Sequence, residues 1–314
     1  MDKNGIRIVA TGRALPKNFI SNDDLSKIVE TNDEWITTRT GIKTRYKCEE
    51  GESCVTLATE AAKKAIEKAD ISKDEIGGVI VATSTPDDAL PSVACMVQRA
   101  LGLRENILAF DISAACTGFL YELGIAKGLL YSTAAKYLLV IGSEQLSRIV
   151  DYTDRGTCIL FGDGAGAAIL CADEKEYDQL FWARGQRELL YCSGVGAKEQ
   201  KISMKGTDVF KFAVVVLKQG IDEILAKNNM TMDDVDCVLC HQANERIIRH
   251  VQKKYPGHED KFYMNLARYG NTSAASIPIA LDEVFEAGIL KEKMRLLCVG
   301  FGAGMTWSSA LLEI

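Results

Sequence analysis

The sequence predicts an α/β protein whose mostly parallel sheets carry helices on their faces. Short apolar runs typical of buried strands alternate with segments whose apolar residues recur at helical spacing, which favours parallel strands. The stretches 68–83 and 227–242 match in their charged, apolar and strand-forming positions at a constant offset of 159 residues. The chain therefore looks duplicated, with halves of about 1–172 and 173–314.

The elements of the first half follow from these patterns in chain order. Strands are expected within 5–16, 77–84, 107–115 and 136–145, and helices within 21–29, 54–70, 91–103 and 119–132. The segment 31–46 is expected to form a helix and a loop, and 151–157 a loop before the glycine-rich segment 161–172. In the second half, a strand is expected at 236–240 and helices at 244–255 and 271–284.

Composition and charge limit the partners. The 314 residues are 47% hydrophobic and 25% charged, as in ordinary globular proteins, and the net charge of −6 disfavours a nucleic-acid partner. The start of the chain lacks the basic segment and apolar core of a signal peptide, and no run approaches the ~20 apolar residues of a membrane span. We therefore expect a cytoplasmic protein with no membrane association.

The ten cysteines are scattered, mostly within apolar segments, which indicates reduced thiols. Cys237 and Cys240 form a CxxC, but in a strand residues three apart point to opposite faces and make a poor chelate. With three histidines and no second CxxC, no metal site is expected.

Cys116 lies where an apolar strand runs into a helix through small residues. At such a junction the free N–H groups and the positive end of the helix dipole favour a thiolate, so Cys116 is a candidate nucleophile. The alternative is a buried apolar cysteine.

His241 and Asn271 occupy similar strand-to-helix junctions in the second half, and the repeat places Cys116 opposite Asn271. Active groups gather beyond the carboxyl ends of parallel strands, so the three side chains are expected to converge. Taken singly, His241 could be a structural histidine and Asn271 a helix N-cap.

Seven segments together resemble one family, the β-ketoacyl-acyl-carrier-protein synthases III of the thiolase-like condensing enzymes. They are DEWITTRTGI, DISAACTGF, FGDGAGA, ISMKGTDVFKFAV, HQANERI, GNTSAASIP and GFGAGMTW, in this order from residue 33 to residue 307. The resemblance implies a duplicated, five-layered αβαβα thiolase-like fold and a homodimer. It also implies a decarboxylating Claisen condensation that initiates fatty acid biosynthesis, in which an acyl-coenzyme A primer, most simply acetyl-coenzyme A, joins malonyl-acyl carrier protein.

The resemblance assigns a catalytic triad of Cys116, His241 and Asn271. Cys116 would carry the acyl group, and His241 and Asn271 would donate hydrogen bonds to the thioester oxygen of the malonyl substrate as carbon dioxide leaves. The backbone N–H groups of Cys116 and Ala303 would hold the oxyanion formed on the acyl group. The coenzyme A thioester is a substrate, and no cofactor is implied.

The same resemblance assigns the binding surfaces. Trp35 and Arg155 would sandwich the adenine of coenzyme A, with Arg39 near its phosphates and Asn244 and Gly206 beside the pantetheine arm. FGDGAG lacks the Lys-Ser/Thr ending of a phosphate loop, so we read it as a tight turn with close packing. A basic helix face would dock the acidic carrier protein; its residues are Arg246, Arg249, Lys211, Lys253 and Lys254.

The sequence departs from the family pattern at two places, and several alternative functions are also compatible with it. Segment 172–200 departs from the family pattern, and Leu90 stands where many relatives carry a Phe that reaches into the partner's acyl pocket, which predicts tolerance of longer primers. A thiolase is one rival, because Cys298 lies in a C-terminal CxGxG. A condensing enzyme with a different acceptor, a thioester hydrolase and a silent coenzyme A binding protein are the others.

Overall fold

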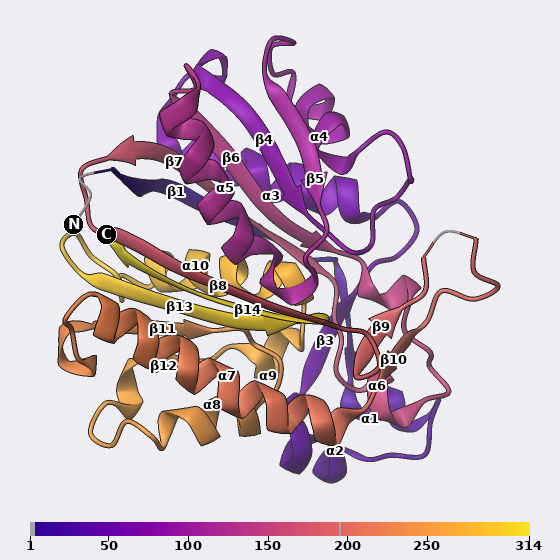
Figure 1. Ribbon diagram of the computed structural model, residues 1–314. Helices are drawn as coiled ribbons and strands as arrows, with labels where there is room; N and C mark the ends of the chain where they lie inside the picture. Colours follow the sequence, from indigo (N-terminus) through magenta and orange to yellow (C-terminus); the bar gives the residue numbers. More distant parts are fainter. Residues whose placement is uncertain (1–3, 195) are drawn as a thin grey trace.

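The computed structural model describes residues 4–194 and 196–314. Residues 1–3, at the start where no signal peptide is expected, and residue 195, within the divergent segment 172–200, lie outside it. Two five-stranded sheets are stacked on one another (Figure 1). The first has the order β1-β7-β6-β4-β5, with bounds Gly5–Ala14, Gly164–Asp173, Tyr137–Glu144, Ile76–Ala82 and Leu108–Ile112. The second has the order β8-β14-β13-β11-β12, with bounds Tyr177–Gln186, Gly304–Glu313, Arg295–Gly302, Cys237–Cys240 and Phe262–Tyr263.

The two sheets repeat the same strand arrangement. In each, the three strands at one end pair in parallel, and the fourth pairs antiparallel with both of its neighbours. Four of the five described strands of each sheet therefore run in one direction, with β7 or β14 reversed. The predicted mostly parallel sheets are confirmed, with this reversed strand added.

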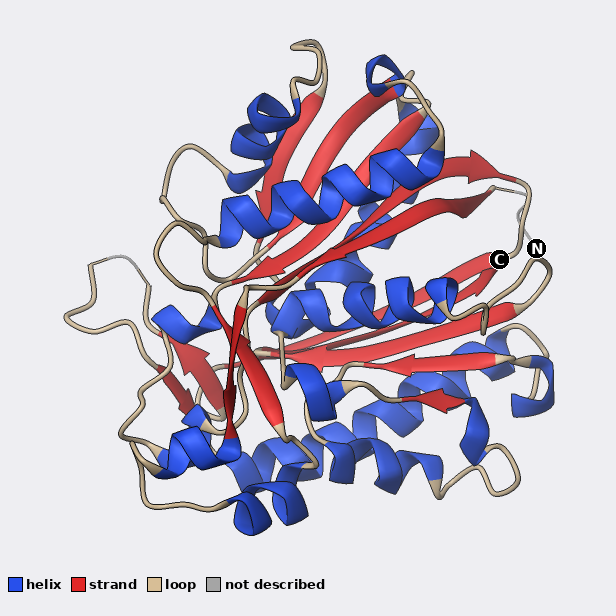
Figure 2. Cartoon of the chain, turned by 180° about the vertical axis from the view of Figure 1, so that it is seen from behind, coloured by secondary structure: helices blue, strands red, loops and turns tan. Residues whose placement is uncertain are grey.

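Alternation of side chains along the strands separates five layers. In β4, Val79 and Val81 pack under the outer helices α3 (Cys54–Ala69) and α4 (Val93–Leu101), whereas Ile80 faces the centre of the molecule. The central layer holds α5 (Gly118–Ser132) and α10 (Ser276–Glu286), between the two sheets. Helices α7 (Gly206–Lys227) and α8 (Glu245–Gln252) cover the far face of the second sheet, and Figure 2 shows the stack from behind.

The CxxC pair illustrates the same alternation. Cys237 faces the central layer and Cys240 faces α7 and α8, so the two thiols lie on opposite sides of β11, as predicted. Among the described residues, no group of three or more His, Cys, Asp or Glu side chains could hold a metal ion. None of the described helices is long and apolar enough to cross a membrane.

Several local expectations were incomplete. Segment 31–46 contains α2 (Asp33–Thr40) but also β3 (Thr44–Lys47), which pairs with β2 (Asn18–Ser21) next to α1 (Asn22–Ser26). The expected loop 151–157 contains the short helix α6 (Arg155–Cys158). Segment 172–200 contributes the edge strand β8 and β9 (Leu190–Cys192), which pairs with β10 (Ile202–Met204). Helix α8 ends at Gln252, so the predicted helix 244–255 was too long at its C-terminal end.

The alignment of Cys116 with Asn271 was wrong. A 3-10 turn precedes α5 at Ala115–Thr117, and another precedes α10 at Ser273–Ala275. Ala115 and Ser273 begin these turns with positive φ values of 46° and 49°, so they are the equivalent residues. Cys116 therefore corresponds to Ala274. The sequence comparison missed this because the short helix α9 (Leu266–Tyr269) lies between β12 and its turn, where the first half has no counterpart.

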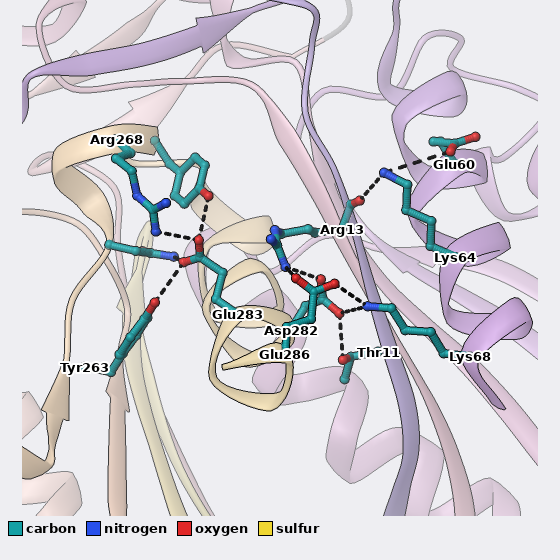
Figure 3. A network of polar contacts seen from close by, with 12 residues as sticks. Thr11, Arg13, Glu60, Lys64, Lys68, Tyr263, Arg268, Asp282, Glu283 and Glu286 are labelled. Atoms are coloured by element: carbon teal, nitrogen blue, oxygen red, sulfur yellow. Dashed lines mark hydrogen bonds and ion pairs between the residues drawn. The ribbon is translucent and has the colours of Figure 1, made fainter. Parts of the chain in front are cut away.

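Acidic side chains of α10 tie the central layer to both halves of the chain (Figure 3). The buried carboxylate of Asp282 accepts hydrogen bonds from Thr11 at 2.8 Å, Arg13 at 2.5 Å and Lys68 at 2.8 Å. The neighbouring Glu283 accepts hydrogen bonds from the second half; the donors are Tyr263, Asn265, Arg268 and Tyr269. These contacts fix α10, whose N-terminal end carries part of the site described below.

We predict that Asp282→Asn lowers the free energy of unfolding by about 2 to 3 kcal/mol, because it removes the charge that pairs with both Arg13 and Lys68 at a buried position. Urea unfolding monitored by circular dichroism measures the change. Glu60→Gln is the control: its pair with Lys64 is long, at 4.0 Å, and half-exposed, so a loss under about 0.5 kcal/mol is expected. Equal losses in the two variants would contradict the prediction.

Candidate active site

A large cavity of about 1260 Å³ opens beyond the carboxyl ends of the parallel strands. Cys116 reaches it after β5, His241 after β11 and Ala303 after β13, while Asn271 arrives from the loop after α9. The predicted convergence of thiol, imidazole and carboxamide is thus present in the structure. Further predicted residues line the same cavity: Trp35, Arg39, Gly206, Lys211, Asn244 and Arg246.

Cys116 is held in the 3-10 turn before α5 and is only 9% exposed. Its Sγ donates to the Ser273 hydroxyl at 3.4 Å, and burial raises the pKa of the thiol to about 12. The free protein therefore holds a neutral thiol, although the helix N-terminus had suggested a thiolate. This depth of burial cannot be read from the sequence.

Close backbone contact joins Cys116 to the far end of β13. A Cβ at Gly302 would lie 2.9 Å from the backbone nitrogen of Cys116, so only glycine allows this approach. Ala303, the next residue, lines the cavity in the turn between β13 and β14. The two backbone N–H groups assigned to one oxyanion hole therefore come from segments in direct contact.

His241 is almost completely buried, and its ring is oriented by Ser276. Its Nδ1 lies 2.6 Å from the Ser276 hydroxyl, which also accepts the backbone N–H of Gln242 at 3.3 Å. We assign the Ser276 hydroxyl proton to the bond with Nδ1, an assignment that leaves the ring proton on Nε2. Burial lowers the pKa of His241 to about 3, so the imidazole is neutral at physiological pH.

Asn271 is fixed at its backbone and at its amide oxygen. Its N–H donates to Leu160 at 2.8 Å, and its carbonyl accepts the N–H of Gly162 at 3.0 Å. Its Oδ1 accepts the backbone N–H of Ser273 at 2.9 Å, an assignment that leaves the Nδ2 group as a donor. Asn271 does not cap α10, whose N-cap is Ala275, so the alternative reading as a helix cap was wrong.

Sequence reasoning missed the residues that position these groups. Gln242 links the loop after β11 to the loop before Asn271, because it donates to Tyr263 at 3.3 Å and accepts from Asn265 at 3.0 Å. Ser273 and Ser276 lie in the recognised segment GNTSAASIP, but serines before a helix are commonly simple caps. Only their contacts with Cys116, Asn271 and His241 distinguish them.

Of the residues expected to bind coenzyme A, Arg155 does not line the cavity but lies against Trp35, which does. The guanidinium carbons of Arg39 and Arg155 lie 4.4 Å and 4.5 Å from the ring centre of Trp35, and Arg155 also donates to the backbone oxygen of Glu30. Asn244 caps α8 through the N–H of Arg246 and donates to the backbone oxygen of Arg39, so its side chain has structural partners as well.

The basic residues separate into two groups. Lys211 and Arg246 line the cavity, and Arg246 lies over the ring of Phe210. Arg249 pairs with Glu245 on α8, while the exposed Lys253 and Lys254 follow the end of that helix. The basic face proposed to dock the carrier protein is therefore formed by residues from the N-terminal parts of α7 and α8 and from the C-terminal end of α8.

Leu90 and Cys298 are not among the residues that line the cavity, whereas the segment FGDGAG contributes Phe161 to its wall. Leu90 is 86% exposed on the chain's surface. Cys298 is buried in β13 against the central layer, as expected for a strand residue. The glycines of FGDGAG allow close packing, since a Cβ at Gly166 would lie 2.6 Å from the backbone of α10; the segment continues into β7 and does not form the predicted tight turn.

The paired sheets and the cysteine at their shared cavity place the chain in the thiolase-like class of acyl-transferring proteins. Family models described as 3-oxoacyl-[acyl-carrier-protein (ACP)] synthase III match residues 110–184 and, for the C-terminal part, residues 225–314. The chain belongs to the β-ketoacyl-acyl-carrier-protein synthase III family, and it is a condensing acyltransferase.

Individual relatives cover the whole chain. Proteins named β-ketoacyl-[acyl-carrier-protein] synthase III from Clostridium tetani and Clostridium novyi are 47% and 45% identical, over 100% and 98% of this chain and 99% and 98% of their own lengths. The crystal structure of 3-oxoacyl-[acyl-carrier-protein] synthase III from Aquifex aeolicus superposes with a TM-score of 0.93 at 45% identity, covering 99% of this chain and all of that one. The predicted family and five-layered fold are confirmed.

We predict that the buried, neutral His241 lowers the free energy of unfolding as the pH drops below 6.5, the pKa of histidine in the unfolded chain. Because its pKa in the folded protein is about 3, the unfolded chain binds one more proton between these values, and stability is lost as the pH falls. Between about pH 7.5 and about pH 5 this single residue should cost about 2 kcal/mol. Urea unfolding at both pH values measures it.

His241→Gln should lose this contribution, so its stability should change less with pH than that of the wild type. His250→Gln, at an exposed position on α8, is the matched control and should keep the wild-type dependence. The prediction fails when both variants behave like the wild type.

Proposed function

We propose that Cys116, His241 and Asn271 carry out the family's decarboxylating condensation, in which an acyl group from coenzyme A joins malonyl-acyl carrier protein to give 3-oxoacyl-acyl carrier protein. One observation carries the assignment. The acceptor atoms of His241 and Asn271 are both occupied, by Ser276 and by the N–H of Ser273, so that Nε2–H and Nδ2–H remain as donors. Two such donors suit an enolate oxygen and do not suit a base.

In the first half-reaction, the Cys116 sulfur attacks the thioester carbonyl of the acyl-coenzyme A and the coenzyme A thiolate leaves. The reaction needs Cys116 to give up its proton, because the thiolate is the nucleophile. The N–H groups of Cys116 and Ala303 stabilise the oxyanion formed at this carbonyl, and they serve again when the acyl group is transferred.

In the second half-reaction, the malonyl group loses carbon dioxide and its thioester oxygen takes the charge of the enolate. His241 and Asn271 donate to this oxygen. The carbanion then attacks the acyl carbonyl on Cys116, and the sulfur leaves. No proton is removed from carbon, since decarboxylation itself supplies the carbanion, so a neutral His241 is sufficient.

Coenzyme A enters over Trp35. Arg155 stacks directly on Trp35 in the free protein, and an adenine sandwiched between them needs about twice that separation. Arg155 must therefore release its contact with Glu30 and move outward when the primer binds, while Arg39 stays beside the ring for the phosphates.

The partner subunit completes the assembly in this proposal. Strand β5 is an edge strand of the first sheet, with Leu108 38% exposed on it, and Leu90 extends 86% exposed from the loop after β4. An exposed edge and apolar side chains of this kind are usually covered. A homodimer formed across β5 covers both, and it lets Leu90 reach the partner's acyl pocket, where its small size leaves room for longer primers. In each subunit, 1–172 supplies the nucleophile and 173–314 the two donors.

We predict that wild type, His241→Ala and Asn271→Ala take up radiolabel from acetyl-coenzyme A, whereas Cys116→Ser does not form a stable thioester. Only the wild type should then convert malonyl-acyl carrier protein to acetoacetyl-acyl carrier protein; loss of one oxyanion donor should slow this step about 100- to 1000-fold. Scintillation counting of the protein and gel separation of the products measure the two steps.

A hydrolase would instead release free acetate without the malonyl substrate, and a silent binding protein would take up no label. A wild type that takes up no label from acetyl-coenzyme A or from longer and branched primers contradicts the proposal. A preference for longer primers over acetyl would support the proposed role of Leu90.

We predict that Arg246→Glu raises the KM for malonyl-acyl carrier protein at least tenfold, because it reverses a charge on the proposed docking face. Acylation by acetyl-coenzyme A should stay within about twofold of the wild type. Lys63→Glu, an exposed reversal on the far helix α3, is the matched control for net charge. Equal KM values for both variants and the wild type would remove Arg246 from the docking surface.

A further inference from the structure

The Cys116 thiol in the free protein faces a hydroxyl, and among the described residues its side chain donates to no other group. The acceptor is Ser273 Oγ, at 3.4 Å, and both side chains are buried. His241 cannot take the thiol proton, since burial keeps it neutral with a pKa of about 3 and its Nδ1 is already occupied by Ser276. A hydroxyl alone is no base, so the proton needs a further acceptor behind Ser273.

Strand β6 places a proton acceptor, the carboxyl group of Glu144, behind Ser273. Gly142 packs against the turn that holds Ser273: a Cβ at Gly142 would lie 2.2 Å from the backbone oxygen of Ala274. Side chains two residues apart share one face of a strand, so Glu144 points toward the same turn. Glu144 is completely buried at the end of β6.

The two carboxylate oxygens of Glu144 differ in their partners. Oε2 accepts from the hydroxyl of Thr85 at 2.7 Å, the N–H of Ser84 at 3.0 Å and the hydroxyl of Thr83 at 3.4 Å. Oε1 has no hydrogen-bond partner of ordinary geometry among the described residues. Burial raises the pKa of Glu144, and the Ser273 side chain and the backbone N–H of Ala274 nevertheless lie close enough to lower it. One buried lone pair is thus available beside the hydroxyl that contacts the thiol.

The electrostatics around Cys116 favour transfer of the thiol proton to Glu144 over its loss to water. The negative charge of Glu144 contributes to the raised pKa of Cys116, so a thiolate formed beside an ionised Glu144 would place two anions in one buried site. Transfer from sulfur to carboxylate keeps a single negative charge. Cys54 also senses the charge of Glu144, and burial raises its pKa to about 12, which keeps it neutral.

We propose that Ser273 and Glu144 form a proton relay that activates Cys116, a role that rests on the proposed function of Cys116 as the acylated residue. The Cys116 S–H bond breaks as its proton passes to Ser273 Oγ, and the Ser273 hydroxyl proton passes to Glu144 Oε1. The thiolate forms the new thioester and expels the coenzyme A thiolate, which is protonated from solvent. In the condensation step the Cys116 thiolate leaves and regains its proton from Glu144 through Ser273, so the enzyme returns to its starting state.

The test is the single-turnover rate at which acetyl-coenzyme A acylates Cys116, followed by intact-mass spectrometry from about pH 5 to about pH 9. Glu144→Gln keeps an oxygen for the donors of Thr83, Ser84 and Thr85 but cannot take a proton. It should acylate about 100-fold more slowly at neutral pH. The wild-type rate should fall only as the pH drops through the raised pKa of Glu144, whereas the variant's rate should climb tenfold per pH unit toward the pKa of the thiol.

Glu122→Gln is the matched control. Glu122 is another residue of the first half with a completely buried carboxyl group, and it lies on α5. Its substitution by Gln removes a carboxyl group just as Glu144→Gln does. Its variant should keep the wild-type rate and pH profile. Circular dichroism and thermal unfolding verify that each variant is folded; where Glu144→Gln is not, Ser273→Ala decides in the same way, since it keeps the backbone N–H that holds Asn271.

Folded Glu144→Gln or Ser273→Ala with a wild-type acylation rate and pH profile would overturn the relay while leaving Cys116 as the nucleophile. A loss equal to that of Glu122→Gln would also overturn it, because the effect would then be one of burial alone. A wild type that is never acylated on Cys116 would overturn the proposed function and the relay together, so the two failures are distinguishable.

Discussion

The site depends on close backbone contact between two equivalent turns and the sheet of the opposite half. The turn of Cys116 lies against Gly302 of the second sheet, and the turn of Ser273 lies against Gly142 of the first. A Cβ at either glycine would overlap main-chain atoms, so a side chain there would separate the halves. This exchange brings a thiol from one half within reach of the imidazole and carboxamide of the other.

Burial then sets the protonation states. It raises the pKa of Cys116, lowers that of His241 and raises that of Glu144, so the first two groups are neutral and the third is easily protonated. Cys116 and His241 therefore contribute polarity to the cavity as neutral groups and not as charges, whereas charged side chains such as Arg39 and Arg246 line other parts of the same cavity. The orientation of the His241 imidazole depends on α10, whose N-terminal end carries Ser276 and whose C-terminal part is fixed by Asp282 and Glu283.

The architecture could be predicted from sequence because it follows from periodicity and the repeat, and the rule for strand ends places Cys116 and His241 at the cavity. Asn271 reaches the cavity from the loop after α9, so the expectation that it directly follows a strand was wrong. The supporting contacts could not be predicted. Glu144 is a polar residue at the end of an apolar strand, and its partner across the layer is known only once Gly142 is seen to pack on the turn of Ser273. The alignment of Cys116 with Asn271 failed because α9 inserts a helical turn into the second half, and the thiolate expectation failed because a helix end is visible in sequence whereas burial is not.

In the proposed mechanism, a neutral His241 also meets a chemical requirement of the condensation. The enolate formed by decarboxylation is a carbon base, and an imidazolium beside it would protonate it before it reached the acyl group on Cys116. A neutral imidazole N–H is far less acidic, so it can hold the enolate oxygen without transferring its proton. Ser276 and the surrounding apolar residues, with Phe301 5.5 Å from the ring, keep His241 in this state. In this mechanism, the same burial of His241 that lowers stability in acid also protects the carbanion from protonation.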